Sequence, residues 1–392
     1  MEKISDQGRL RPWMGFVLFA VLMLFFIFIC APLQVNLGIL GLVITEVAFL
    51  AIAVVYCLIR KVKIREVFPV KKLKIREIIG AILLVLGVFP FSIISVAITA
   101  LIFPGSTAEV GELTSFVYGD LNYPMAVLII ALLPAICEEA IHRGAILSNF
   151  RNIKYDWIIV LVMGLLFGIN HVSILRFGST FILGMALSYV VVKKNNILLS
   201  MIMHFTNNLI SVSAAYLSDS VSVDTSNVDY MPVLGTYLLI GFAGPILITL
   251  GIMLIKPESH RKIRFLYAGI IASVMLIAGI GITFANSAKS TLVNNTIGYE
   301  VTLEGKDCVI GEFDVEEERT AAVAAVLANA EKGYTVRIDG DSGSNIINAE
   351  IPDGAVRMIA YNIELAPDHY VVTLVPDEDA VGEHPLIEIR IQ

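Results

Sequence analysis

Long apolar runs separated by short polar stretches fill roughly the first three quarters of the chain. A helix needs about 20 mostly apolar residues to cross a bilayer core roughly 30 Å thick, and most of the runs reach that length. The nine runs lie at about 13–35, 37–59, 78–103, 123–148, 157–175, 177–192, 196–217, 233–255 and 265–285. The shortest, at 177–192, could be a partial or re-entrant segment. The pattern predicts an all-α polytopic membrane bundle of about eight or nine transmembrane helices.

The pattern changes near residue 297, where short runs alternate between apolar and polar residues. A period of two predicts half-buried β-strands, whereas the Ala-rich stretch Glu316–Glu331, acidic in its first turn, predicts a helix. The predicted strands are Ile297–Leu303, Val309–Phe313, Thr335–Ile338, Ala355–Ile363, Tyr370–Val375 and Ile387–Ile391. We therefore expect a transmembrane helical bundle at 1–285 and a small soluble α+β domain at 286–392.

The composition supports this division. The chain is 57% hydrophobic and 16% charged, whereas soluble proteins are about 45–50% apolar and about 25% charged, so a purely soluble, disordered or fibrous protein is excluded. Residues 1–285 contain 21 Lys and Arg and 15 Asp and Glu, a balance of +6, and residues 286–392 contain 7 and 20, a balance of −13. The negative balance argues against nucleic acid and anionic lipid as partners of the C-terminal part.

Loop charges predict how the bundle lies in the membrane, because loops rich in Lys and Arg face the cytoplasm. The loops after the second, fourth, sixth and eighth runs are basic, and those after the third and seventh runs are acidic without Lys or Arg. The basic loops contain Arg60–Arg76, Arg151 with Lys154, Lys193 with Lys194, and Lys256–Arg264; the acidic loops contain Glu109, Glu112, Asp120, Asp219, Asp224 and Asp229. We expect a multi-pass protein of the cell membrane with a cytoplasmic N-terminus and an extracytoplasmic C-terminal domain. Arg176, in a predicted outer turn, is the exception, and an even number of spans with one re-entrant helix is the alternative.

Few ionisable residues lie inside the predicted spans, and such residues are candidates for function because charge is costly at membrane depth. They are Glu46, Glu138, Glu139, Arg143, His171 and His204. All except Glu46 lie between the fourth and seventh runs. Their clustering indicates one functional site formed by these spans.

The fourth span carries two adjacent carboxylates, Glu138 and Glu139. Residues four apart share one helix face, so Glu139 can pair with Arg143. Glu138 points about 100° away from Glu139 and needs a partner on another helix. Pro134 removes a backbone N–H just before the two carboxylates, which could admit water. A purely structural ion network is the alternative interpretation of these charges.

His171, in the fifth span, is expected to lie opposite Glu138. The turn between the two spans is predicted near 152–155, about 16 residues from each of them, so an antiparallel hairpin places both at matching depth. His204 and Asn208 are four apart in the seventh run and share one face. By simple counting His204 lies nearer the basic edge than Glu138, so the fourth and fifth helices would have to project into the cytoplasm for all three to meet.

Together these residues have the chemistry needed to hydrolyse a peptide bond with activated water. A buried carboxyl such as Glu138 suits a general base, and His171 could help hold the attacking water. His204 and Asn208 could face the carbonyl oxygen as it becomes an oxyanion, while the ion pair on the fourth span would orient the site.

A metal-bound water is an equally open alternative. Glu138, His171 and His204 could bind zinc as three protein ligands and leave the fourth position to water. The chain contains no H-E-x-x-H motif, and no Ser or Cys nucleophile is paired with these groups. The sequence alone therefore leaves zinc as one possible cofactor and a metal-free site as the other.

Three motifs resemble the signature of the CPBP family, the CAAX-protease and bacteriocin-processing (Abi-like) intramembrane proteases. They are Glu138-Glu139…Arg143, Phe167…His171 and His204…Asn208, in the family's order and on separate spans. The resemblance covers about residues 120–215. It implies an endopeptidase acting within the membrane, in which Glu138 activates water and the two histidines complete the site; both metal-dependent and metal-free mechanisms have been argued for the family. The domain after residue 286 is not required by this signature.

The function predicted from the sequence is an intramembrane endopeptidase that cleaves a peptide or membrane-protein substrate, with no nucleic-acid partner. A non-catalytic member of the same fold, serving as an immunity or regulatory scaffold, is the main alternative. A proton-coupled transporter is a third, because intramembrane carboxylates and histidines also form proton relays. Transporters often contain paired repeats with broken helices, and the sequence shows no such symmetry.

Overall fold

The computed structural model of the chain describes residues 10–107, 121–218, 221–223, 230–257, 262–287, 293–298, 301, 307–330, 332–343, 345–351, 356–377 and 380–391. The chain divides into two compact units. The first is helical and comprises Met1–Ala214 and Tyr230–Ile282. The second contains the β-strands and comprises Ala215–Asp229 and Thr283–Gln392.

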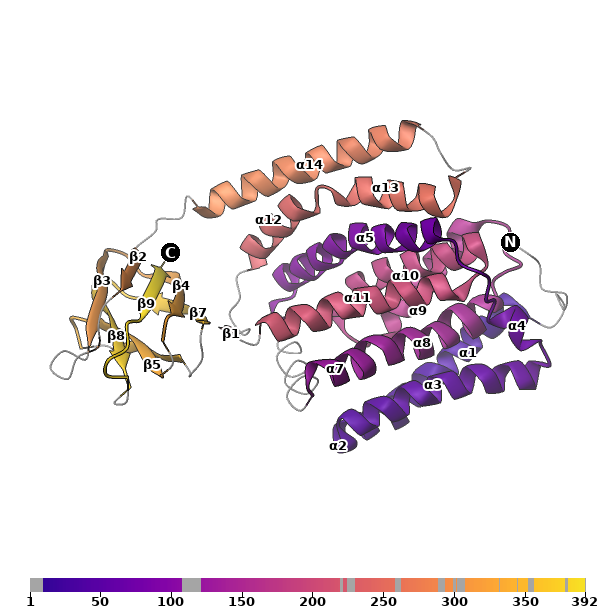
Figure 1. Cartoon of the computed structure of the whole chain (residues 1–392), viewed down its shortest axis with the longest axis horizontal. Coiled ribbons are helices and arrows are strands. Elements are labelled where there is room, and N and C mark those ends of the chain that lie inside the picture. Colours follow the sequence, from indigo (N-terminus) through magenta and orange to yellow (C-terminus); the bar gives the residue numbers. More distant parts are fainter. Residues whose placement is uncertain are drawn as a thin grey trace. The chain divides into compact units, whose positions relative to one another are not determined.

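The first unit consists of long helices packed side by side (Figure 1). Three short segments, η1, η3 and η4, are π-helical turns that continue α-helices without a break, and η2 is a 3₁₀ turn. The elements are α1 (Pro12–Phe25), η1 (Phe26–Cys30), α2 (Ala31–Leu37), α3 (Ile39–Arg60), α4 (Ile64–Val67), α5 (Ile75–Ile102), η2 (Pro104–Thr107), α7 (Tyr123–Ala126), η3 (Val127–Leu132), α8 (Leu133–Glu139), η4 (Ala140–Ile146), α9 (Asp156–Asn170), α10 (Ile174–Lys194), α11 (Ile197–Ser218), α12 (Tyr230–Gly241), α13 (Gly244–Ile255) and α14 (Lys262–Ser287).

Among the described residues, seven helices are long and apolar enough to cross a membrane, or eight if α12 and α13, bent by 44°, form one span. The remaining predicted run corresponds to α9, an apolar helix of only 15 residues. The prediction that 177–192 is the shortest run was wrong, because α10 has 21 residues. It begins earlier than predicted, where the Ser173 hydroxyl accepts a hydrogen bond from the Arg176 backbone N–H, so Arg176 lies in a helix rather than in a turn.

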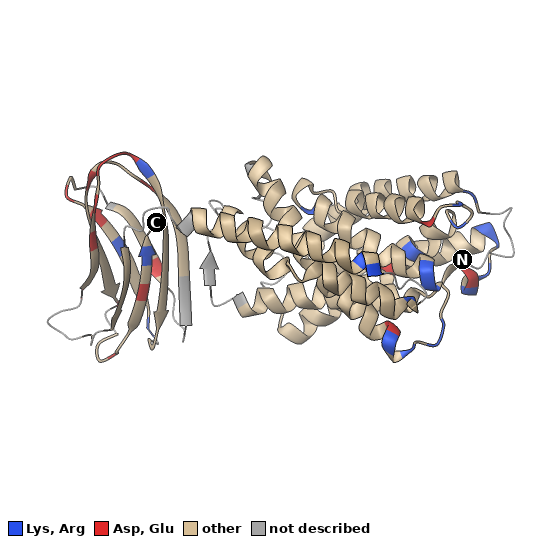
Figure 2. Ribbon diagram, turned by 90° about the horizontal axis from the view of Figure 1, so that it is seen from above, with Lys and Arg blue, Asp and Glu red and all other residues tan. Residues whose placement is uncertain are grey.

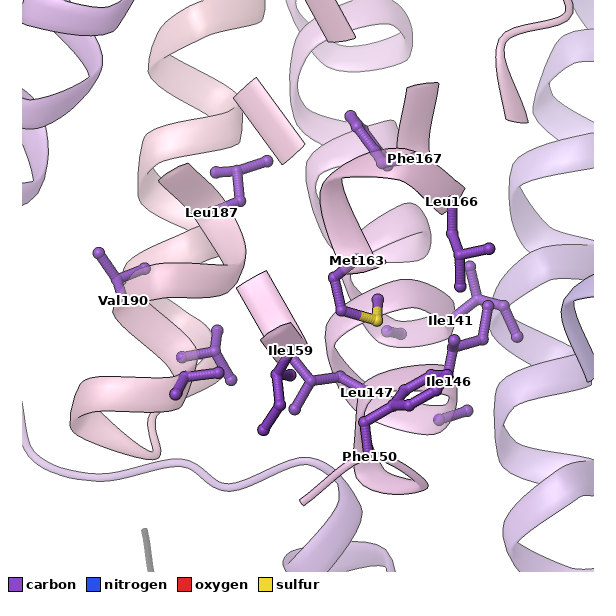
Figure 3. Close-up of a cluster of buried hydrophobic side chains, with 14 of the residues drawn as sticks. Ile141, Ile146, Leu147, Phe150, Ile159, Met163, Leu166, Phe167, Leu187 and Val190 are labelled. Atoms are coloured by element: carbon purple, nitrogen blue, oxygen red, sulfur yellow. The ribbon is translucent and has the colours of Figure 1, made fainter. Parts of the chain in front are cut away.

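The hydrophobic core of this unit includes side chains from the helices that carry the ionisable residues singled out in the sequence. Met163 and Phe167 of α9 are fully buried, and so are Ile141 and Ile146 of η4. Figure 3 shows these side chains in one cluster with Leu147, Phe150, Ile159, Leu166, Leu187 and Val190. Interiors packed at this density fix side-chain positions, so the core holds the fourth and fifth spans in a defined register.

Lys and Arg gather at one end of the helical unit, the end where its described N-terminal residues lie (Figure 2). Two ion pairs stabilise that end: Lys193 Nζ lies 2.5 Å from Asp156 Oδ2, and Lys194 Nζ lies 2.6 Å from Glu77 Oε1. Burial lowers the pKa of the Arg151 guanidinium to about 10. The residues of the predicted acidic loops, Glu109, Glu112, Asp120, Asp219, Asp224 and Asp229, lie outside the described residues.

The second unit contains two β-sheets whose buried side chains form a single hydrophobic cluster. One sheet has the order β1-β7-β4-β9-β2 and the other the order β3-β8-β5-β6. The strands are β1 (Val221–Val223), β2 (Val293–Gly298), β3 (Cys308–Val315), β4 (Arg319–Ala328), β5 (Tyr334–Gly340), β6 (Asn345–Ile351), β7 (Val356–Leu365), β8 (Asp368–Pro376) and β9 (Leu386–Ile391). All described pairs are antiparallel except that of β1 with β7.

The helix predicted at Glu316–Glu331 is wrong, and so is the α+β class for this domain. Residues Arg319–Ala328 form β4 instead, paired on both sides by β7 and β9. Alternate residues of β4 are buried, including Val323 and Leu327, so the segment has the period of a strand facing a core. Alanine favours helix only weakly, and pairing on both sides outweighs that preference.

Candidate active site

A cavity of about 450 Å³ lies among α3, α5, α8, α9, α10 and α11. It collects several of the polar groups that lie deep in the helical unit. Its ionisable and amide-bearing residues are Gln34, Glu46, Glu138, Asn170, His171, Arg176, His204, Asn207 and Asn208. Most of the remaining lining residues are apolar, including Phe49, Phe89 and Phe167. A few polar groups in an apolar cavity are typical of a ligand or active site.

Beside the cavity, Glu139 joins two other elements through one carboxylate oxygen. Arg143 Nη1 donates to Glu139 Oε1 at 2.8 Å, and His204 Nδ1 lies 3.0 Å from the same oxygen. The Glu139 and Arg143 side chains are completely buried. The four-residue spacing predicted the ion pair, whereas the contact to His204, 65 residues away, is tertiary.

Arg143 has two further contacts that fix its guanidinium. Nη2 donates to the backbone oxygen of Gly184 at 3.1 Å. The guanidinium carbon lies 4.2 Å from the centre of the Phe167 ring, a distance at which a cation is attracted to an aromatic face. Arg143 therefore links η4 to α10 and α9 and supplies the positive charge that keeps Glu139 ionised.

The Phe167 ring separates three imidazoles. Its centroid is 4.9 Å from that of His171, 5.1 Å from that of His142 and 5.8 Å from that of His204, all in edge-to-face geometry. Such packing leaves few rotamers for the histidine rings. The Phe of the Phe-x-x-x-His motif thus has a physical role, which is to hold the rings that flank it.

The hydrogen bond of His171 assigns its tautomer. Its Nδ1 lies 2.9 Å from the backbone oxygen of Phe167. A carbonyl oxygen only accepts hydrogen bonds, so Nδ1 carries the proton and Nε2 has a free lone pair. His171 follows the last residue of α9 and lines the cavity, where Nε2 can accept a hydrogen bond from water.

The same reasoning assigns His204. Because Arg143 keeps Glu139 ionised, the Glu139 carboxylate only accepts hydrogen bonds, and His204 Nδ1 donates to it. His204 also lines the cavity. Its Nε2 is an acceptor when the ring is neutral and becomes a donor when the ring is an imidazolium.

Glu138 lines the cavity, and no described residue forms a hydrogen bond with its Oε2. His171 and His204 line the same cavity. Glu138 and His204 therefore lie around one cavity, although counting residues along the spans placed them at different depths in the membrane. The π-helical η4 lies between Glu138 and the end of its helix. A π-turn contains more residues than an α-turn. Glu138 therefore lies closer to the end of its helix than it would if every intervening residue were α-helical.

Asn208 and its neighbour Asn207 form an amide pair at the cavity wall. Asn207 Nδ2 donates to Asn208 Oδ1 at 3.2 Å, and Asn208 Nδ2 donates to the backbone oxygen of Ile130 at 3.3 Å. An amide NH₂ has two hydrogens, so one Asn208 N–H is left over. Asn207 was not singled out in the sequence, although its place beside Asn208 in a span was a signal.

The segment that carries these residues matches a known protein family. Residues 120–210 match the family described as Rce1-like, type II CAAX prenyl endopeptidase Rce1-like, which belongs to the CPBP family. This segment is an Rce1-like domain. The Rce1-like domain contains all three motifs on which the resemblance rested, and its kind of activity is that of an intramembrane protease. No curated protein and no solved structure matches the chain.

Among the described residues, no three His, Cys, Asp or Glu side chains form a group that could hold a metal ion. Glu138, His171 and His204 share the cavity wall without forming such a group. The zinc ion that the sequence left open as a cofactor stays a prediction.

Two further residues of the Rce1-like domain were not singled out in the sequence. His142 is completely buried, and no described residue forms a hydrogen bond with either of its ring nitrogens. Asn170 is 5% exposed and lines the cavity, and its Oδ1 has no described partner. Asn170 directly precedes His171 in the sequence. Two adjacent polar residues inside an apolar span could have identified Asn170 as a candidate site residue.

Proposed function

We propose that this protein is an intramembrane endopeptidase that hydrolyses a peptide bond with a water molecule activated by Glu138. The observation that carries the proposal is that one cavity in an apolar helical unit collects Glu138, His171, His204 and Asn208. Its occurrence in an Rce1-like domain supports a protease.

In the first step, the Glu138 carboxylate would accept a proton from water as the water oxygen attacks the carbonyl carbon of the substrate. His171 Nε2 would accept a hydrogen bond from the second hydrogen of that water, since Nδ1 is the protonated nitrogen. Acceptors on both hydrogens of one water molecule orient its oxygen lone pairs towards the carbonyl carbon. A positioned general base of this kind contributes about 10²–10⁴-fold to the rate.

The carbonyl oxygen becomes an oxyanion in this step and needs donors. The left-over N–H of Asn208 can supply one. His204 can supply the other only as an imidazolium, because its Nδ1 proton is already donated to Glu139. The hydrogen bond to Glu139 fixes the orientation of the ring, so the Glu139–Arg143 pair acts as a positioning unit for His204.

The proposed reaction uses no metal ion, and the chelator in the test below distinguishes it from the zinc-bound water that the sequence left open. The substrate would be a peptide segment of a protein at or within the bilayer. The basic end of the helical unit (Figure 2) supports a cytoplasmic position for that end. We place the acidic second unit outside the cytoplasm, as a solvated module.

The test is cleavage of a quenched-fluorescent peptide library by the purified full-length protein in detergent, with and without a chelator. We expect cleavage of a subset of peptides, with rates unchanged by the chelator. Absence of cleavage across the library would favour the non-catalytic scaffold. Cleavage abolished by the chelator and restored by added zinc would contradict the metal-free mechanism.

A further inference from the structure

Glu46 is a buried carboxylate that the proposed mechanism has not used. It lies in α3, outside the Rce1-like segment at 120–210, and is 4% exposed. It nevertheless lines the cavity that contains Glu138. A buried carboxyl in an apolar helix is costly, so its position beside the proposed base calls for a chemical explanation.

The two carboxylates share one cavity. Helices α3 and α8 pack side by side (Figure 1), and each contributes one carboxylate, Glu46 or Glu138, to the wall of that cavity. No described residue forms a hydrogen bond with Oε2 of either one. Two neighbouring carboxylates in a low-dielectric site cannot both be ionised, so one proton is held by the pair.

We infer that Glu46 is the general acid of this site: it holds the proton of the Glu46–Glu138 pair and delivers it to the leaving amine. The inference rests on the proposed function, and it adds a catalytic residue from α3 to the Rce1-like segment. A base and an acid on one cavity would provide both proton transfers that peptide hydrolysis requires.

The proton balance of the cycle closes. Water attacks the carbonyl carbon, the C–O bond forms, and Glu138 takes one water proton. The C–N bond of the tetrahedral intermediate then breaks as Glu46 gives its proton to the nitrogen, which releases an amine and leaves Glu46 ionised. The proton that Glu138 took from water then passes to Glu46, so the pair again holds one proton. The products are one carboxylic acid and one amine.

The surrounding groups favour Glu46 for this task. His171 Nε2 carries no proton to give, and His204 donates towards the oxyanion. The other titratable or charged groups near Glu46 are the thiols of Cys30 and Cys137, and Arg176 across the cavity. Neither a thiol nor a guanidinium is a suitable acid at neutral pH. Glu46 is therefore the second carboxyl of the cavity and can give a proton to the leaving amine while Glu138 still holds the proton that it took from water.

The test separates acid catalysis from a structural role by changing the leaving group. The probe is the library peptide that the wild-type protein cleaves fastest, together with the depsipeptide in which the scissile amide is an ester. An alcohol leaves more readily than an amine and depends less on protonation. Glu46→Gln should lower kcat for the amide by about 10²–10⁴-fold and change kcat for the ester little.

Three variants complete the experiment. Glu138→Gln should lose activity on both substrates, because both need the attacking water. Glu46→Asp should recover part of the amide activity. Glu77→Gln removes another buried carboxylate of the unit, one paired with Lys194 away from the cavity, and should keep both activities.

Equal losses by Glu46→Gln on the amide and the ester, or no loss on the amide, would overturn the inference while leaving the proposed function standing. A wild-type protein that cleaves no peptide would overturn both. The thermal unfolding midpoint of each variant shows whether it is folded, and Glu46→Asp provides the comparison if Glu46→Gln does not fold.

Discussion

The charge on Arg143 determines much of the chemistry around the cavity. This side chain is completely buried, yet it contacts a carboxylate, a carbonyl oxygen and an aromatic face. Because its charge keeps Glu139 ionised, the proton between Glu139 and His204 belongs to His204. One buried cation is thus connected through Glu139 to His204.

Glu139→Gln should therefore be strongly destabilising. It leaves the Arg143 guanidinium buried without its counter-charge, which costs about 3–5 kcal/mol. The thermal unfolding midpoint of the detergent-solubilised protein should fall accordingly. The double variant Glu139→Gln, Arg143→Met should regain part of the loss, since it buries no unpaired charge. A single variant as stable as the wild type would show that the pair contributes little.

His369 supplies a pH-dependent interaction in the second unit. Its Nδ1 lies 2.8 Å from Asp314 Oδ1, its cross-strand neighbour, and this hydrogen bond raises the pKa of His369 above its ordinary 6.5. The stabilisation is therefore fully present below pH 6.5 and is lost as the pH rises through the raised pKa.

Hydrogen exchange of β8 in the full-length protein measures this effect. Relative to the wild type, His369→Gln should exchange faster at pH 6, and the difference should disappear by about pH 9. A difference that persists unchanged at high pH would mean that the imidazolium–carboxylate interaction is not its cause.

For single residues, sequence reasoning found the buried ion pair that helical spacing determines. The Glu139–Arg143 pair follows from four residues of helix, and Glu138 and His171 were expected at matching depth. The contact of His204 with Glu139 could not be predicted, because it depends on how α11 packs against the fourth span. Glu46 was noticed only as a charge in an apolar run, since nothing local connects it to Glu138.

At the scale of elements, the apolar runs predicted the spans well because lipid imposes one length on helices. The prediction failed where that rule does not apply. The helix α9 has only 15 residues and ends at Asn170, next to the cavity-lining His171. The segment β4 is a strand because two neighbouring strands pair with it, so tertiary partners determined its structure.

The pairing of α5 with α13 depends on glycine. A Cβ on Gly251 would lie 2.7 Å from the backbone oxygen of Gly80, and one on Gly244 would lie 2.7 Å from that of Gly87. The helices therefore approach backbone to backbone at two points seven residues apart, a small-residue contact of the kind found between membrane helices.

Gly251→Ala should force these helices apart and cost about 1–3 kcal/mol. Gly269→Ala, in α14, is the matched control, because a Cβ there meets no atom within 4 Å. Thermal unfolding of both variants provides the measurement. If Gly251→Ala is as stable as Gly269→Ala, the close approach of α5 and α13 is not required.

At the scale of the whole molecule, the two units differ in kind. The helical unit is a multi-pass membrane structure with a Rce1-like domain, and the second is a pair of sheets with its own core. The sequence predicts a boundary near residue 285, where composition and charge change. It did not predict that Val221–Val223, between two helices, would pair with β7 of the second unit.

Cys308 provides a natural reporter for the proposed orientation. It lies in β3 and is partly exposed, whereas Cys30, Cys57 and Cys137 are buried. Burial raises the pKa of the Cys308 thiol, so labelling is best done at mildly alkaline pH. A membrane-impermeant maleimide should label it in intact cells, and a Lys72→Cys variant lacking Cys308 should be labelled only after permeabilisation. The reverse pattern would place the second unit in the cytoplasm.

The central claim is that a water molecule activated by Glu138 cleaves a peptide bond. The most direct measurement is kcat of purified Glu138→Gln on the best library peptide, beside the wild type and Glu77→Gln, all with matched unfolding midpoints. The account predicts a loss of about 10²–10⁴-fold for Glu138→Gln and wild-type rates for Glu77→Gln. A folded Glu138→Gln variant that cleaves at the wild-type rate would contradict it.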